Sequence, residues 1–228
     1  MAVHSMRSLA ELETGYILAA ERYDPRRSSQ LTGGELRRSI TLDSIVEVAR
    51  TIVTTSSGAG GEVVVLDTTN AQEGVIINRR PPVSFAEIGS AKKLLEPRDV
   101  IVSRLRPYLR QVAYVDDAVP FVKQGVALVC SSEFFVLRSR NGQSIAFLTP
   151  FLLSEPVQRI LSAAQEGGHH PRFNLETLLS LRMPQKLVEE RNGISEIIEN
   201  AVVEFRKSES AISQAIGRAN QSMKDAVL

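Results

Sequence analysis

Cysteine, long apolar runs and net charge are all scarce in this chain of 228 residues. The single cysteine, Cys130, excludes an internal disulfide and is typical of proteins from a reducing cytoplasm. Because Cys130 follows the apolar run 126–129, we expect a buried small side chain rather than a nucleophile. No stretch approaches the roughly 18 apolar residues of a membrane span. We therefore predict a cytoplasmic protein that contacts no membrane.

The near absence of net charge limits the partners that the surface as a whole can bind. With 27 basic and 26 acidic residues, the formal charge is +1, which argues against a generally basic coat for nucleic acid. The charges are nevertheless segregated, because residues 102–110 carry three arginines and no acid, whereas acidic residues concentrate in 186–209. A local basic patch is compatible with this distribution, and the 43% of hydrophobic residues predict a packed core.

The motifs of common enzymes are missing as well. The sequence has no phosphate-binding loop, glycine-rich dinucleotide turn, zinc-protease helix or CxxC pair. His169 and His170 are adjacent and point to different sides in an extended chain, which argues against a metal pair. We interpret Asp116 and Asp117 as a turn after a strand; a nuclease site that adds Glu133 is the alternative. We thus predict a binding module with no catalytic residue, no metal and no cofactor.

Proline is absent after Pro184, and the following sequence has the pattern of one long helix. Its apolar residues recur at alternating spacings of four and three, interrupted only by Glu209, as in a coiled-coil seam. About 38 helical residues span roughly 57 Å, too long to lie against such a body throughout. We predict that the helix pairs with a second copy or a partner protein; a solvated terminal helix is the alternative. The expected interface seam comprises Ile198, Val202, Phe205, Ile212, Ile216, Ala219, Met223 and Ala226.

Before Pro184, short strand and helix patterns follow one another without an internal repeat. β-Branched residues bounded by turn-forming residues predict the strands. The fold class is therefore α/β, of the α+β type, with a mixed-strand domain at 1–184 and a long helix at 185–228. The predicted strands are 62–66, 74–78, 99–103, 111–115, 126–130 and 134–137.

Helical spacing and capping residues predict several short helices before the long one. Thr41 is expected to cap a helix over 41–53, and Asn174 to cap a helix over 175–179. Residues 9–20 fit either a short helix or a strand. Two further helices are predicted at 144–153, with a kink or break at Pro150, and at 156–165.

Five segments, taken in their order and spacing, match the pattern of one known family. Residues 65–76 look like its strand, short loop and G-x-I hairpin, and 94–104 (LLEPRDVIVSR) like its polar turn, Asp, apolar strand and Ser-Arg. Residues 146–156 look like its helix ending in a Leu-Ser turn, 167–178 like its glycine loop and N-x-x-x-L helix start, and 181–184 like its last strand. The chain resembles the target recognition domains of type I restriction-modification specificity subunits. Those subunits carry two recognition domains and two long helices, so this chain is similar to half a subunit.

The resemblance implies a DNA sequence-recognition module of a type I-like restriction-modification or methylation-based defence system. Its partners would be double-stranded DNA and a DNA methyltransferase subunit, and the terminal helix would dock that subunit or a second copy of the chain. S-Adenosylmethionine and ATP would belong to partner subunits. The rival is an adaptor that binds no DNA and assembles a complex through its helix, and the near-neutral charge supports this rival.

Polar and basic side chains on expected loops are the candidate DNA contacts. Arginine donates two hydrogen bonds at once to guanine or phosphate, and glutamine reads adenine. Residues 104–110 join two expected strands, so we predict a hairpin tip with a tyrosine available for stacking. The predicted contacts are Arg104, Arg106, Tyr108, Arg110, Arg79, Arg80, Lys123, Gln124, His169, His170 and Arg172.

Overall fold

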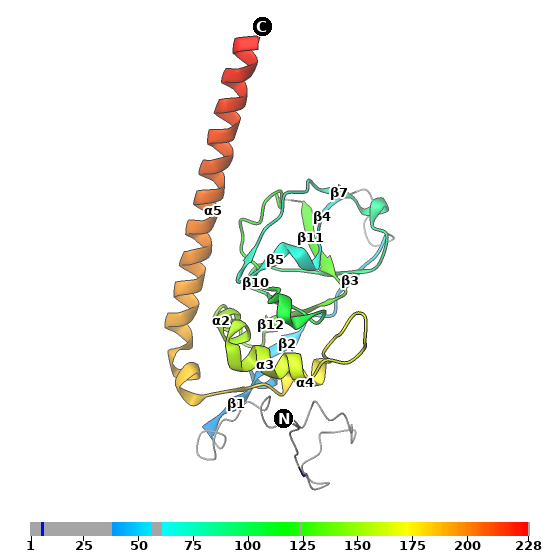
Figure 1. Cartoon of the computed structure of the whole chain (residues 1–228), viewed down its shortest axis with the longest axis vertical. Coiled ribbons are helices and arrows are strands. Elements are labelled where there is room, and N and C mark those ends of the chain that lie inside the picture. The colour runs from blue at the N-terminus through cyan, green and yellow to red at the C-terminus, as the bar shows by residue number, and fades with distance from the viewer. Residues whose placement is uncertain (1–5, 7–37, 56–60, 124, 228) are drawn as a thin grey trace, which may run out of the picture.

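A computed structural model describes residues 6, 38–55, 61–123 and 125–227, with side chains as far as residue 225. Sheets and short helices form a body over residues 38–184, and one long helix, α5 (Gln185–Val227), runs along this body and beyond it (Figure 1). The predicted α+β fold with a long C-terminal helix is confirmed. The prediction for residues 9–20 lies outside the described residues.

A four-stranded antiparallel sheet is the central layer of the body. Its strand order is β10-β9-β12-β2, and β-branched residues dominate β9, which is buried along its whole length. Alternate residues of β9 face opposite sides, because side chains in a strand alternate. The strands are β2 (Val46–Val48), β9 (Val100–Ser103), β10 (Val112–Tyr114) and β12 (Phe134–Ser139).

A five-stranded sheet of order β3-β8-β11-β4-β7 packs against one side of this central layer. Its β4–β11 pair is parallel, with Val63 opposite Ala127, and its other pairs are antiparallel. Its strands are β3 (Ile52–Val53), β4 (Glu62–Leu66), β7 (Val83–Ser84), β8 (Lys92–Leu94) and β11 (Val126–Ser131). The remaining elements are the pairs β1 (Ile40–Thr41) with β13 (Arg182–Met183) and β5 (Ala71–Gln72) with β6 (Val75–Ile76), and the 3₁₀ turns η3 (Leu42–Ser44), η4 (Thr68–Asn70), η5 (Phe85–Glu87) and η6 (Pro107–Leu109).

The two faces of the central sheet belong to different cores. Val100 and Val102 contact the core under the helices, whereas Ile101 contacts the core between the two sheets. Cys130 is fully buried in the second core, as predicted. Burial raises the pKa of its thiol to about 12, so the sulfur stays protonated and unreactive.

The predicted helix over 41–53 is wrong. This segment forms η3, β2 and β3 instead, and Thr41 pairs with Arg182 in a strand without capping anything through its side chain. Most of its apolar residues serve the core, although Ile52 is 50% exposed; β2 pairs with β12 and β3 with β8. Strand pairing places Val46 and Val53 in two different cores, which outweighs the helical spacing of the segment.

The short helices lie close to their predicted places. Helices α2 (Leu148–Leu153) and α3 (Glu155–Ala163) are separated at Ser154, which is extended, so the break predicted at Pro150 falls four residues later. Pro150 lies in the first turn of α2, where a missing N–H costs little. The cap predicted for α4 (Leu175–Leu179) is confirmed, because Asn174 Oδ1 accepts a hydrogen bond from the Thr177 N–H at 2.8 Å.

The 43 residues of α5 divide into a packed half and an exposed half. Val202 is 3% exposed and belongs to the core under the helices, and Ile198 packs against the same core. These two predicted seam residues are therefore covered by the chain's own body. Ile212 is 62% exposed, and Ile216 and Met223 are similarly exposed. From residue 210 to 225 every side chain of the helix is exposed, and Figure 1 shows the C-terminal end of α5 extending past the body. The side chain of Ala226 lies outside the described part of the chain.

Candidate nucleic-acid interface

The arginine turn (residues 104–110) connects β9 to β10, as predicted, and is strained. Arg106 and Arg110 have positive φ angles of 48° and 54°, and Pro107 opens η6 between them. The Arg110 N–H donates to the Pro107 carbonyl oxygen at 2.8 Å and closes this 3₁₀ turn. Residues other than glycine adopt positive φ angles at an energetic cost. Residues with such backbone strain cluster at functional sites. The turn leaves Tyr108 57% exposed.

The glycine loop (residues 166–172) is hydrogen-bonded to the arginine turn. The Arg106 N–H donates to the Pro171 carbonyl oxygen at 2.9 Å, and the Phe173 N–H to the Arg104 carbonyl oxygen at 3.2 Å. Arg106 Nη2 also lies 3.3 Å from Nδ1 of the exposed His170. Two segments about 60 residues apart thus share one surface, and this surface carries the predicted contacts of both.

Glu133, at the turn between β11 and β12, joins two of these arginines. Its carboxylate accepts hydrogen bonds from Arg172 at 2.8 and 2.9 Å and from Arg104 at 3.0 Å. The hydrogen bonds from Arg172, reinforced by those from Arg104, lower the pKa of Glu133 to about 2 despite its partial burial. Arg104 and Arg172 therefore hold the two segments together. Arg106 and Arg110 instead have exposed partners, His170 and Glu73, which hold them less firmly than Glu133 holds Arg104 and Arg172.

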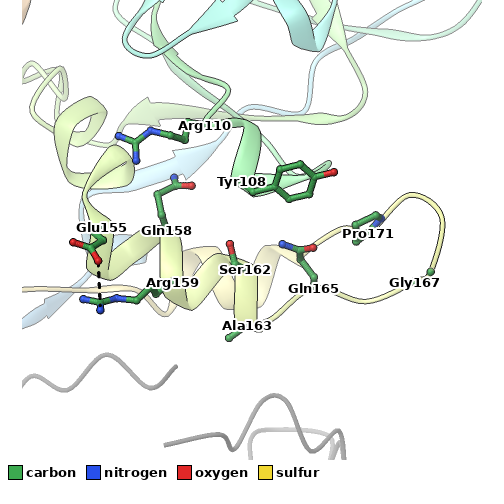
Figure 2. Close-up of a pocket in the computed structure, with 11 residues that line it drawn as sticks. Tyr108, Arg110, Glu155, Gln158, Arg159, Ser162, Ala163, Gln165, Gly167 and Pro171 are labelled. Carbon is green, nitrogen blue, oxygen red and sulfur yellow. Dashed lines mark ion pairs between the residues drawn. The ribbon is translucent and has the colours of Figure 1, made fainter. Parts of the chain in front are cut away.

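A groove of about 830 Å³ separates the arginine turn and the glycine loop from α3. Figure 2 shows Tyr108 and Arg110 on one wall, with the helix on the other. The sequence predicted the helix from its apolar residues but missed the polar residues that recur at spacings of three and four on its other face. The residues lining the groove are Tyr108, Arg110, Glu155, Gln158, Arg159, Ser162, Ala163, Gln165, Gly167, Gly168 and Pro171.

The other predicted contacts belong to a second basic segment. Asn78 is buried, and its side-chain amide donates to the carbonyl oxygens of Arg80 at 3.0 Å and Pro120 at 3.4 Å. This brings Arg79 and Arg80 beside the loop that leads to Lys123, and these three residues are exposed. Arg80 pairs with Asp67 at 2.8 Å. Among the described residues, no hydrogen bond or ion pair links this segment to the arginine turn. Gln124 lies outside the described residues.

Asp116, considered above as a nuclease ligand, binds the long helix instead. Arg206 of α5 donates to both of its carboxylate oxygens, at 3.1 and 2.8 Å, and pairs with Glu209 as well. The side chains of Arg206 and Asp116 are each about 10% exposed or less. The Ala118 N–H also donates to Asp116, at 2.9 Å, which fits the predicted turn. The sequence did not reveal this pair, because its members lie 90 positions apart.

Polar contacts also fix α5 closer to its start. Ser195 Oγ accepts a hydrogen bond from the Phe147 N–H at 3.1 Å. Glu199 accepts hydrogen bonds from Ser144 at 2.6 Å and from Tyr114 at 3.3 Å. Burial, together with the charge of Glu199, raises the pKa of the Tyr114 hydroxyl, which remains a hydrogen-bond donor. The helix is therefore held in one rotation and one register on the body.

The described part of the chain has neither a metal-binding cluster nor a membrane-spanning helix. Within it, no three histidine, cysteine, aspartate or glutamate side chains lie close enough together to hold a metal ion. Among the helices of residues 38–55, 61–123 and 125–227, none combines the length and apolarity needed to cross a bilayer.

Solved structures identify the class of protein to which this fold is similar. One matching chain comes from a structure of complex assembly and conformational transition of the type I R-M (restriction-modification) system, with a TM-score of 0.55 and 20% identity. The match covers 84% of this chain and 48% of that one. No family model and no curated protein matches the sequence.

A second similar structure is the HsdS subunit from Thermoanaerobacter tengcongensis. Its TM-score is 0.54 at 20% identity, and the match covers 82% of this chain and 47% of the HsdS subunit. The resemblance to type I specificity subunits is thereby confirmed at the level of the fold. The chain spans about half the length of each of these two proteins.

Proposed function

We propose that this chain is the DNA sequence-recognition module of a type I-like restriction-modification or methylation-based defence system. The observation that carries the proposal is the joining of the arginine turn and the glycine loop on a body with the type I specificity fold. Arg106 and Arg110 supply guanidinium groups that suit phosphate or guanine, and Tyr108 supplies an exposed ring. In this proposal residues 1–184 read DNA, and residues 185–228 dock partners.

The exposed half of α5 is proposed to bind a partner methyltransferase and a second copy of the chain. Ile212, Ile216 and Met223 leave apolar surface in water, at a cost of roughly 25 cal/mol per Å² that a partner helix would remove. Two copies would bring together two recognition modules, and the two-fold symmetry of such a dimer would match a palindromic site. The support is the row of apolar side chains that the described part of the distal helix leaves exposed.

The chain is proposed to have no catalytic activity of its own. Asp116, the best carboxylate for a nuclease, already pairs with Arg206 and caps its own turn. We expect no cleavage and no methyl transfer by the purified chain. Metal-dependent cleavage that disappears in Asp116→Asn would contradict this proposal.

DNA binding is tested by selecting duplexes from a random library with the full chain and measuring affinity by fluorescence anisotropy. We expect affinity to fall steeply with salt, because bound phosphates release counterions. Arg106→Ala should cost about 1–3 kcal/mol if that side chain reads a base. Arg140→Ala, an exposed arginine after the end of β12 that lies away from the arginine turn, is the matched control.

The alternative is an adaptor that assembles a complex through α5 without binding DNA, and the net charge of +1 favours it. The triple variant of Arg104, Arg106 and Arg110 to alanine separates the two functions. If the folded triple variant kept the DNA affinity of the wild type, or if the wild type enriched no duplex at all, the adaptor function would replace the proposed one.

A further inference from the structure

We infer that the groove beside α3 is a nucleotide subsite, in which Arg159 binds a DNA phosphate and Gln158 accepts a hydrogen bond from a base amino group. This inference rests on the proposed DNA-binding function and extends it to a helix outside the arginine turn and the glycine loop. Three features of the groove support it: the polar face of α3, an unpaired oxygen in its wall, and two weakly paired arginines.

Helix α3 has two different faces. Val157 and Leu161 are 4% exposed or less and belong to the core under the helices. Arg159 and Ser162, with Gln165 just beyond the end of the helix, line the groove instead, opposite η6. Folding alone does not require this set of hydrogen-bonding side chains on the wall of a groove. A ligand that presents several polar groups would use them.

Gln158 carries the most specific feature. It is 9% exposed, and its Nε2 donates to the Leu152 carbonyl oxygen at 2.6 Å. This bond fixes the amide orientation, because the flipped side chain would bring two oxygens together. Gln158 Oε1 is therefore an acceptor, and it has no partner among the described residues. Figure 2 shows the side chain pointing from α3 toward the segment that carries Arg110.

A buried acceptor without a partner is unusual in a folded protein, and a ligand donor would satisfy it. Adenine N6 and cytosine N4 are such donors on the edges of base pairs. Because Oε1 is covered in the free chain, the subsite requires the side chain to turn this oxygen toward the groove that Gln158 lines while Nε2 stays bonded to Leu152. Tyr108, on the opposite wall, supplies an exposed ring for stacking.

The arginines of the groove have partners that a phosphate can displace. Arg110 Nε lies 2.8 Å from Glu73, and Arg159 Nη1 lies 3.5 Å from Glu155, with all four side chains well exposed. Exposed pairs of this kind contribute little, whereas a phosphate takes two parallel hydrogen bonds from one guanidinium. One ligand that supplies an anionic phosphate, a flat ring and an amino donor is a nucleotide. Because the groove adjoins the proposed interface, we assign it to a nucleotide within a DNA strand.

The test uses the full chain and duplexes selected by the wild type, with anisotropy measured over a range of salt concentrations. We expect Arg159→Ala to weaken binding to every duplex by about three- to tenfold and to reduce the salt slope by about one. Gln158→Met should instead lower the preference for one base at one position by about fivefold or more. Arg140→Ala should change neither quantity, and thermal unfolding confirms that each variant is folded.

The outcomes separate this inference from the proposed function. If Arg106→Ala weakens binding but Arg159→Ala matches Arg140→Ala in affinity and salt slope, the DNA-binding function stands and the subsite is refuted. An unchanged base preference in folded Gln158→Met refutes the role of the amide. Calorimetry with free dAMP distinguishes the source of the ligand: binding of dAMP with unchanged duplex affinity in Arg159→Ala overturns the assignment to a DNA strand.

Discussion

Replacing Arg206 with alanine should be among the most damaging single changes on α5. The Asp116 carboxylate is only about 10% exposed in the wild type. The change removes the two hydrogen bonds that this carboxylate accepts from the guanidinium group. Removing one partner of a buried ion pair costs about 3–5 kcal/mol. Asp116 retains the Ala118 N–H as a donor, so we expect the lower end, about 3 kcal/mol. With a denaturant slope of about 3 kcal/mol per M, the urea midpoint falls by about 1 M.

Urea unfolding followed by circular dichroism measures this loss. Lys207→Ala is the matched control, because the neighbouring Lys207 is exposed and pairs only with Glu204 of the same helix among the described residues. Its effect should stay within about 0.5 kcal/mol. The double variant Arg206→Met with Asp116→Asn removes both charges and should recover most of the stability. A loss in Arg206→Ala no larger than in Lys207→Ala would show that the pair does not hold the helix on the body.

Three further predictions concern other parts of the molecule. The pKa of Glu133 is lowered to about 2 from an ordinary 4.5. Its ionised carboxylate therefore contributes fully to stability above about pH 4.5, and this contribution is lost as the pH falls through about 2. Thermal unfolding across that range should show a smaller loss in Glu133→Gln than in the wild type. The double variant Ile212→Asp with Ile216→Asp should lose self-association or methyltransferase binding, measured by light scattering, while the body stays folded. A wild-type chain that stays monomeric and binds no partner would show that the helix is only solvated. Since burial raises the pKa of Cys130 to about 12, a thiol reagent at neutral pH should label it only after unfolding, and fast labelling of the folded chain would contradict the buried thiol.

The sequence predicted the elements whose local pattern and tertiary role agree. β-Branched runs became strands β4, β9, β11 and β12, and Asn174 caps α4, because each depends on neighbours in the sequence. The segment 41–53 was misread, because its helical spacing conflicts with pairing to strands some 40 to 90 residues away. Local pattern contains no information about that pairing.

The candidate site was predicted in part for the same reason. The arginine turn follows from the two strands that flank it, so its place at a hairpin tip was predictable. Its contact with the glycine loop and the position of Glu133 between two arginines depend on the complete fold. Gln158 could not be recognised, because an unpaired buried oxygen is defined only by its surroundings.

The exposed half of α5 projects from the body as a rigid arm, and Arg206 is the last described residue that an ion pair anchors to the body. From there to residue 225 the helix extends roughly 29 Å. A tilt of about 5° at Arg206 displaces the tip by about 2.5 Å, close to the spacing of about 3.4 Å between successive base pairs. In the proposed dimer, two modules joined through their exposed helices would contact half-sites at the correct spacing only if the angle between α5 and the body is held within a few degrees. The stiffness of the contacts that hold α5 on the body, of which the Arg206 pair is the last, would then limit how accurately the two half-sites are spaced.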